Sequence, residues 1–292
     1  MMIFLPAELG RYVYRFATSA EAKLYGLEKT QVDIGEMVMS IHRTPIEDRE
    51  TILMLHGFSS DKVIWSRFAK HFTDDYNVII PDMAGHGDTG FSKNWNYGAK
   101  AQVDRLIQLL DELKISKVHV IGNSMGGFFS AHMAIRYPER LLSTAFIDPA
   151  GVTSSIASDL ERMVKSGHNP FIVNSRQEFD KFYAMTMAKP PWLPDFVLQA
   201  VSEKYQNRSE QLAQIFSDFH QKDMLDESLD QIKLDTLLLW GEKDQLLHIS
   251  SVDAWQAGIP NIKVKTWEDI GHMPMLEIPV ESAAVYREFL ER

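Results

Sequence analysis

The sequence contains no cysteine. A chain without thiols cannot form disulfides, bind zinc through thiolates or attack a substrate with a cysteine nucleophile. This absence says little about the compartment, because a chain of 292 residues can be stable without disulfides.

Cationic residues are outnumbered, with 30 Lys and Arg against 40 Asp and Glu and a net charge of -10. Binding to nucleic acid requires clustered cationic side chains, so this balance argues against nucleic acid as a partner. Long apolar runs are also missing. The opening run at residues 1–5 is too short for a membrane span or a signal sequence and lacks a basic lead-in. We therefore expect a cytoplasmic protein, with association to a membrane as the alternative.

The composition is that of a folded globular chain. Hydrophobic residues make up 45% and charged residues 24%, which is typical of a soluble protein with a sizeable core. The length would allow two average domains, but α/β chains of this size often fold as one.

The N-terminal segment, residues 1–30, has a helical apolar pattern with two interpretations. Its apolar positions are Leu9, Tyr12, Val13 and Phe16, with Arg11 and Arg15 close by. The favoured interpretation is that this stripe packs against the body of the protein. The alternative is peripheral contact with a membrane surface.

Strand and helix patterns alternate after about residue 30. The strand candidates are 32–41, 51–56, 77–82, 117–122, 144–148, 235–241 and 262–267. Most are short and almost wholly apolar, as strands covered on both faces should be. Helical spacing marks 103–113, 127–137 and 281–291. This alternation predicts an α/β fold with a mostly parallel central sheet flanked by helices.

Residues 152–232 interrupt this alternation. They contain helical patterns broken by Pro170, Pro190, Pro191 and Pro194 but no strand candidate. We expect a helical cap inserted into a core formed by residues 31–151 and 233–292. It should lie over the carboxyl edge of the sheet, where ligands bind in open α/β sheets.

The strongest chemical signal is Gly122-Asn123-Ser124-Met125-Gly126, a G-x-S-x-G pattern between a predicted strand and a predicted helix. A sharp turn there would hold the Ser124 hydroxyl clear of the backbone as a nucleophile. The Met125 N–H, at the start of the helix, could stabilise an oxyanion. A passive serine in a glycine-rich turn is the less favoured alternative.

A serine nucleophile needs a base and an orienting acid, which follow it in the order acid, then histidine. Asp244 comes directly after the predicted strand 235–241, and His272 lies in the loop after 262–267. Taken singly, they could be a helix N-cap and a loop histidine. Asp148, at the end of 144–148, is a rival acid, but we favour Asp244.

The second oxyanion donor is expected in the loop after the first parallel strand, which makes the Phe58 N–H the candidate partner of Met125. We expect His56, two residues earlier, to be structural rather than a second base.

Residues 85–90 match the dinucleotide-binding pattern G-x-G-x-x-G, but turn-forming residues follow where that site requires a helix. We expect no nucleotide and no other cofactor. The histidines lack metal-ligand spacing, so no metal is expected either.

Large apolar residues are frequent in the predicted cap, and some should line an acyl-chain pocket. The candidates in the cap and beside the predicted base are Phe171, Phe182, Met185, Trp192 and Met273.

With these motifs assembled, the chain resembles α/β-hydrolase-fold serine hydrolases from about residue 28 to its end. The motifs are His56-Gly57-Phe58, Asp82-Met83-Ala84-Gly85-His86-Gly87, Gly122-Asn123-Ser124-Met125-Gly126-Gly127, Trp240-Gly241-Glu242-Lys243-Asp244 and Gly271-His272. Within that fold, the stretches HGFSSDKVIW, GNSMGG and FIDPAGV are similar to bacterial family V lipases and to the mammalian α/β-hydrolase-domain monoacylglycerol lipase.

The resemblance implies a carboxylic ester hydrolase, an esterase or lipase acting on monoacylglycerols or similar lipid esters through an acyl-enzyme. It implies Ser124 as nucleophile, His272 as base and Asp244 as acid. Two alternatives remain. Carbon–carbon bond hydrolases of aromatic catabolism carry similar elbows, but usually with a Gly-Pro-Gly-type loop where this chain has Phe58-Ser59-Ser60. A non-catalytic binding protein on the same fold would not need an intact triad.

Overall fold

The computed structural model describes residues 6–292. The apolar run at residues 1–5, considered above as a signal or membrane segment, lies outside the described residues.

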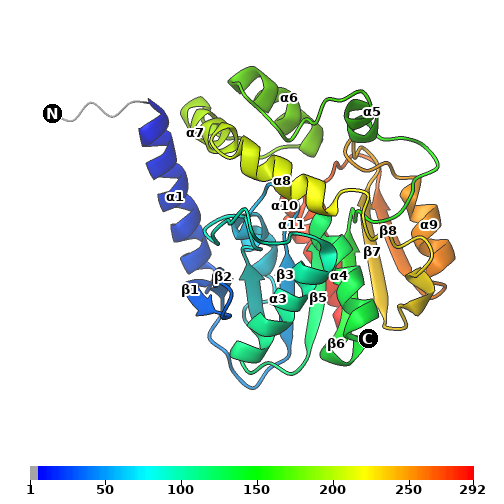
Figure 1. Ribbon diagram of the computed structural model, residues 1–292. Helices are drawn as coiled ribbons and strands as arrows, with labels where there is room; N and C mark the ends of the chain where they lie inside the picture. Colours follow the sequence, from blue (N-terminus) through cyan, green and yellow to red (C-terminus); the bar gives the residue numbers. More distant parts are fainter. Residues whose placement is uncertain (1–5) are drawn as a thin grey trace.

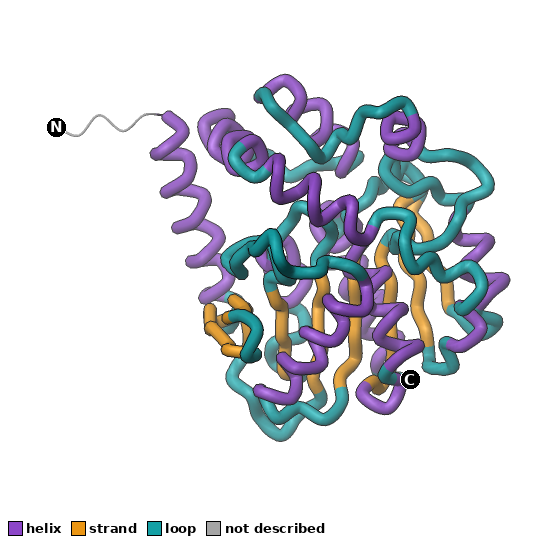
Figure 2. Tube along the Cα trace, viewed as in Figure 1, coloured by secondary structure: helices purple, strands orange, loops and turns teal. Residues whose placement is uncertain are grey.

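The core is an eight-stranded sheet in the order β1-β2-β4-β3-β5-β6-β7-β8. Its strands are β1 (Glu28–Asp33), β2 (Val38–Arg43), β3 (Thr51–Leu55), β4 (Asn77–Pro81), β5 (Val118–Asn123), β6 (Leu141–Ile147), β7 (Thr236–Gly241) and β8 (Lys263–Trp267). From β4 to β8 all neighbouring strands are parallel, whereas β2 pairs antiparallel with β1 and β4. The predicted α/β fold with a mostly parallel sheet is confirmed. Figure 2 shows the strands in the centre of the molecule with helices around them.

One predicted strand is wrong. Residues 32–41 are not a single strand but the middle of the β1–β2 hairpin. The chain turns at Gly35, whose φ of 85° suits glycine, and the Gly35 N–H donates to Asp33 Oδ1 at 2.8 Å. The other predicted strands agree with the structure to within three residues at either end.

Helices cover both faces of the sheet. They are α2 (Ser66–Ala69), α3 (Ala99–Glu112), α4 (Met125–Arg136), α9 (Ser251–Gly258), α10 (Pro274–Glu277) and α11 (Pro279–Leu290). Alternate residues of β3 enter two separate apolar clusters, with Leu53 on the side of α3 and α4 and Met54 on the side of α2 and α11. The strand is apolar throughout because both faces are buried.

Four α-helices lie between β6 and β7 in the sequence: α5 (Asp159–Lys165), α6 (Arg176–Thr186), α7 (Asp195–Gln206) and α8 (Ser209–Phe219). They gather at one end of the sheet, as Figure 1 shows. The aromatic rings of Phe216 and Phe219 on α8 reach down to Phe58 after β3, with centroids 5.5 and 5.4 Å away. The predicted helical cap is therefore confirmed as part of the fold.

Helix α1 (Pro6–Leu24) stands at one side of the molecule and packs against α7 (Figure 1). The contact is tightest at Gly10, where a Cβ atom would lie 2.0 Å from the Phe196 carbonyl oxygen. The apolar stripe was expected to make this contact, but Leu9, Tyr12 and Phe16 are exposed. The expected packing against the body is therefore present, but these three side chains do not make it. The close approach of the two backbones needs a small residue, and Gly10 lies on a neighbouring face of the helix.

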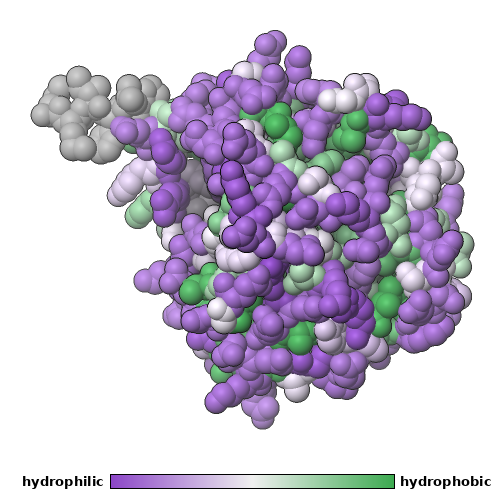
Figure 3. Space-filling view, viewed as in Figure 1, coloured by the Kyte–Doolittle hydropathy of each residue, from purple (hydrophilic) through white to green (hydrophobic). Residues whose placement is uncertain are grey.

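No helix within residues 6–292 is long and apolar enough to cross a membrane. The face shown in Figure 3 is mostly hydrophilic, with small scattered hydrophobic areas.

Candidate active site

Ser124 sits at the turn between β5 and α4, with φ 55° and ψ -118°. A non-glycine residue rarely adopts positive φ, and the neighbouring glycines make this turn sterically feasible. A Cβ on Gly122 would lie 2.2 Å from the Gly126 carbonyl oxygen, and one on Gly126 would lie 2.2 Å from that of Leu55. The predicted sharp strand-to-helix turn is present.

His272 and Asp244 form a buried pair near the carboxyl ends of β8 and β7. The His272 Nδ1 lies 2.6 Å from Asp244 Oδ2, with side-chain exposures of 5% and 0%. The other Asp244 oxygen accepts the backbone N–H groups of Leu246 at 2.7 Å and Leu247 at 3.1 Å. These bonds assign the proton of the neutral imidazole to Nδ1, leaving Nε2 as the basic nitrogen.

Two residues that the sequence reasoning missed hold the histidine loop in place. The Asn123 amide donates to the backbone oxygens of His272 at 2.9 Å and Ile147 at 3.2 Å. Glu277 Oε1 accepts the Gly271 N–H at 3.0 Å. Asn123 lies inside the elbow motif and its position beside Ser124 was a usable signal, whereas Glu277 belongs to no motif.

The elbow and the histidine loop are thus connected through Asn123. Among residues 6–292, the Ser124 hydroxyl itself makes no hydrogen bond. Catalytic hydrogen bonds are often long without substrate and tighten when it binds, so this geometry is compatible with a serine–histidine pair.

The rival acid Asp148 is buried beside Asp244, in a backbone conformation with φ 44°. Burial and the negative charge of Asp244 raise the pKa of Asp148 well above its usual value. The imidazole Nδ1 is bonded to Asp244, not to Asp148.

Asp148, Asp244 and His272 also present potential metal-ligand atoms within 4.8 Å of one another. Two of those ligands, Asp244 and His272, are hydrogen-bonded to each other at 2.6 Å, which leaves no space for an ion between them. The arrangement favours proton sharing over metal binding.

Two backbone amides border Ser124. The Met125 N–H opens α4, and the first N–H groups of a helix have no partner inside it. The Phe58 N–H donates to no acceptor within the described part of the chain. A Cβ on the preceding Gly57 would lie 3.2 Å from Ser124 Cβ, so this loop runs directly past the serine.

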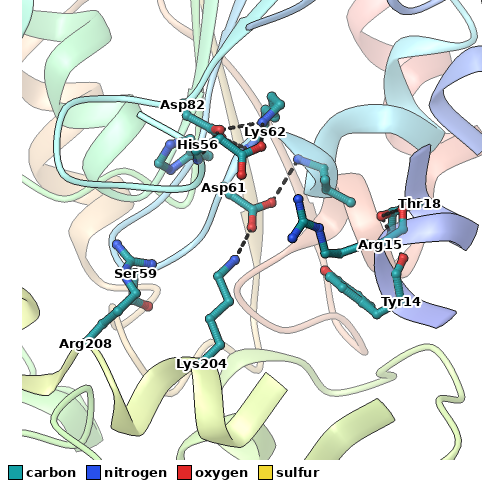
Figure 4. A network of polar contacts seen from close by, with 12 residues as sticks. Tyr14, Arg15, Thr18, His56, Ser59, Asp61, Lys62, Asp82, Lys204 and Arg208 are labelled. Carbon is teal, nitrogen blue, oxygen red and sulfur yellow. Dashed lines mark hydrogen bonds and ion pairs between the residues drawn. The ribbon is translucent and has the colours of Figure 1, made fainter. Parts of the chain in front are cut away.

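Ionic contacts fasten the loop that carries Phe58, as Figure 4 shows. Lys62 Nζ lies 2.5 Å from Asp82 Oδ2, and both side chains are buried. Lys204 on α7 pairs with Asp61 at 2.7 Å. The loop is therefore bound on one side to the end of β4 and on the other to the cap.

The glycine-rich turn at residues 85–90 encloses a protein carboxylate. The Asp88 N–H donates to Asp82 Oδ2 at 2.7 Å, and a Cβ on Gly87 would lie 2.1 Å from Asp82 Cγ. The next helix begins only at Ala99, so the turn lacks the helix N-terminus on which a pyrophosphate rests.

His56 has both ring nitrogens engaged with the backbone. Its Nε2 accepts the Met83 N–H at 3.1 Å and its Nδ1 lies 2.8 Å from the Gly57 oxygen. Burial lowers its pKa, so it stays neutral and joins two loops.

A cavity of about 130 Å³ opens beside Ser124. Its walls are mostly apolar, with a few polar residues. The lining residues are Phe58, Ser124, Phe128, Ala150, Gly151, Val152, Thr153, Leu160, Glu161, Phe171, Phe216, Phe219, His220, Gln221, Met224, Leu246 and Leu247.

Of the five pocket candidates, Phe171 lines this cavity. Phe182 packs behind it with ring centroids 4.9 Å apart, and Met185 is half-buried against the same core. Met273 is buried next to His272 in the opposite cluster. Trp192 is 84% exposed, after two prolines, and does not reach the cavity.

The chain is similar to known proteins along most of its length. Residues 50–279 match the family described as alpha/beta hydrolase fold. The chain is 34% identical to Lipase 1 of Psychrobacter immobilis over 244 residues, covering 82% of this chain and 76% of that protein. It is 28% identical to the monoacylglycerol lipase ABHD6 of Mus musculus over 254 residues, covering 83% and 76%.

Among solved structures, a membrane phospholipase A described as a bacterial virulence factor superposes with a TM-score of 0.92 and 33% identity, covering 99% of this chain and 92% of that one. A meta-cleavage product hydrolase superposes with a TM-score of 0.77 at 22% identity, covering 90% and 97%, which is a likeness of fold.

Proposed function

Since this chain belongs to the α/β-hydrolase fold family and is a carboxylic ester hydrolase, we propose that it cleaves lipid esters, monoacylglycerols or similar molecules, through an acyl-enzyme on Ser124. The observation that carries the proposal is the buried His272–Asp244 hydrogen bond, joined to the serine elbow through Asn123.

In the proposed reaction, Ser124 Oγ attacks the ester carbonyl carbon while His272 Nε2 takes the hydroxyl proton. Asp244 keeps the other imidazole proton on Nδ1 and stabilises the imidazolium. The Phe58 and Met125 amides donate to the tetrahedral oxyanion. The imidazolium then protonates the leaving alcohol. Water, activated by the same imidazole, attacks the acyl-enzyme and releases the fatty acid.

The cavity supports a substrate with one apolar chain. Its walls are formed largely by aromatic and aliphatic side chains from the loop after β3, from α4 and from the cap.

We also propose peripheral contact of α1 with the lipid surface that holds the substrate. Leu9, Tyr12 and Phe16 are 45%, 67% and 66% exposed and lie on one face of the helix. The Tyr12 and Phe16 rings stack with centroids 6.3 Å apart. Amphipathic helices with exposed aromatic residues and nearby cations, here Arg11 and Arg15, bind membrane interfaces.

The test compares initial hydrolysis rates on a long-chain monoacylglycerol and a short-chain p-nitrophenyl ester, with the folded Ser124→Ala variant as the blank. We expect a preference for the monoacylglycerol and a loss of at least about 10³-fold in the variant. Activity on the short ester alone would replace the lipid substrate with a small one. Undiminished activity in Ser124→Ala would overturn the mechanism. If the parent protein hydrolyses neither substrate, carbon–carbon bond hydrolysis or a binding role would be favoured instead.

A further inference from the structure

Asp148 is a buried acid to which the mechanism above gives no role. It follows β6, and its backbone N–H donates to the Leu239 oxygen at 2.9 Å. One side-chain oxygen, Oδ1, accepts the Gly241 N–H at 2.9 Å. The other, Oδ2, is fully buried and accepts no hydrogen bond from residues 6–292.

The carboxyl group of Asp148 lies close to that of Asp244. Asp148, Asp244 and His272 present side-chain atoms within 4.8 Å of one another, and all three residues are buried. Two buried carboxylates at such a separation cannot both ionise at neutral pH, so one of them retains a proton.

Hydrogen bonding decides which acid keeps the proton. Asp244 accepts three N–H donors, from Leu246, Leu247 and His272. Asp148 accepts only the Gly241 N–H. Because N–H donors stabilise the ionised form, Asp244 carries the negative charge and Asp148 the proton.

The other groups that face Asp148 leave this assignment unchanged. Burial raises the pKa of Asp148, and so do the charges of Asp244 after β7 and Glu277 on α10. His272, from the loop after β8, would oppose them only while it is protonated, and its Nδ1 is directed at Asp244.

We propose that Asp148 is a positioning residue that stays a neutral carboxylic acid and donates its Oδ2 proton in a hydrogen bond to Asp244. The proposal rests on the proposed function for its catalytic meaning. The bond adds a fourth donor to Asp244 and holds that carboxylate toward His272. It also keeps the acid pair at a single negative charge, so that the imidazolium formed in the reaction faces one anion.

The experiment compares the parent protein with Asp148→Asn and Asp148→Gly. The asparagine amide retains a donor, cannot titrate and tolerates the positive φ, whereas glycine suits the backbone but removes the donor. We expect Asp148→Asn to retain kcat within about threefold of the parent. Asp148→Gly should lose about tenfold or more in kcat with KM nearly unchanged, and the asparagine rescues that loss.

The second readout is the melting temperature from pH 4 to 9, which needs no substrate. In the unfolded chain Asp148 releases its proton near pH ~3.9, but in the folded protein it keeps it to a higher pH. A group with a raised folded pKa stabilises the fold at low pH, and that contribution is lost as pH rises through the folded pKa. The Tm of Asp148→Asn should therefore rise relative to the parent by several degrees as pH increases.

A Tm difference that stays constant from pH 4 to 9 would overturn the proposal, since Asp148 would then be ionised in both states. Inactive Asp148→Asn alongside active Asp244→Asn would overturn it too, because Asp148 would be the acid of the triad. Absence of ester hydrolysis in the parent, together with the pH-dependent Tm difference, would refute the proposed function and leave the protonated Asp148 standing.

If Asp148→Asn does not fold, ¹³Cγ-aspartate NMR on the parent replaces it. We expect one carboxyl resonance that keeps the shift of a protonated acid at pH 7. If every aspartate has the ionised shift at that pH, the proposal is wrong.

Discussion

Asn123 is the residue that couples the nucleophile turn to the base. Its amide donates to the backbone oxygens of Ile147 and His272, so the last residue of β5, directly before Ser124, also holds the loop of the histidine. A buried carbonyl that loses its donor reduces the free energy of unfolding by about 1–3 kcal/mol. Here the lost donor would also leave the loop that carries the base less well positioned.

We predict that Asn123→Ala lowers both stability and kcat, with kcat falling about tenfold or more. Asn77→Ala is the matched control, since Asn77 likewise donates to two backbone oxygens, of Glu47 and Arg49, at the far end of the sheet. It should lose similar stability and keep its kcat. Steady-state kinetics and thermal melts check both, and equal kcat losses would refute the positioning role.

His42 on β2 should make the folded protein less stable in acid. Burial and the nearby Lys62 charge lower the pKa of His42 to about 4 in the folded protein. In the unfolded chain its pKa is ~6.5, so the unfolded chain takes up this proton at a higher pH than the folded protein does. Stability should fall as pH drops from about 6.5 to about 4, by up to about 3 kcal/mol from this group. Denaturant melts of His42→Gln should show a shallower fall than the parent, and an unchanged slope would contradict the prediction.

Activity should also fall in acid, for a different reason. A protonated His272 cannot accept the Ser124 proton, so hydrolysis stops while the protein is still folded. Rates measured from pH 5 to 8, beside circular dichroism at each pH, separate the two effects. A flat rate across this range would exclude His272 as the base.

At the scale of elements, the loop after β3 connects the cap to the oxyanion site. Lys204 and Tyr205 on α7 bind Asp61 and Ser59, which lie in the loop that carries the Phe58 amide. Burial alone would raise the pKa of Asp61, but the charge and hydrogen bond of Lys204 outweigh it and hold the pKa well below its usual value.

We predict that Lys204→Met destabilises the protein by about 1–2 kcal/mol, because it leaves the half-buried Asp61 charge without its partner. It should also reduce kcat by loosening the loop. Adding Asp61→Asn should recover part of the stability. The control Lys100→Met removes an exposed pair with Asp104 and should cost no more than about 0.5 kcal/mol. Chemical denaturation and steady-state rates measure each, and an additive double variant would show the pair uncoupled.

At the scale of the whole molecule, the net charge is -10 and the face shown in Figure 3 is mostly hydrophilic. The lipid proposal uses the exposed apolar side chains of α1, which are Leu9, Tyr12 and Phe16. The helix rests on the cap through α7, so a lipid surface bound to α1 would lie beside the cap rather than beneath the sheet.

We predict that Tyr12→Ser with Phe16→Ser weakens co-sedimentation with phosphatidylglycerol vesicles at least fivefold, since it removes apolar area from the proposed contact. Hydrolysis of a soluble short-chain ester should not change. Val280→Ser, which alters an exposed apolar residue on α11, is the control and should bind as the parent does. Equal binding of all three proteins would exclude α1 as the contact.

Local patterns in the sequence determined the alternating strands and helices, the inserted cap and the serine turn. Each depends on near neighbours: apolar runs for buried strands, and glycines where the backbones of Gly122 and Gly126 meet. Chain order also placed Asp244 and His272 after the carboxyl ends of neighbouring strands, because parallel strands end at one edge of the sheet.

Contacts between distant segments were decided only by the tertiary structure. Periodicity identified α1 but not the face that packs, since close approach at Gly10 outweighed the apolar stripe. The sequence predicted that the pocket residues are apolar, but not which of them line the cavity. Trp192, for example, points to solvent. The pairing of His272 with Asp244, and of Asp148 with Asp244, depends on distances across three loops. Such distances are set by packing of the whole sheet, which no local pattern encodes.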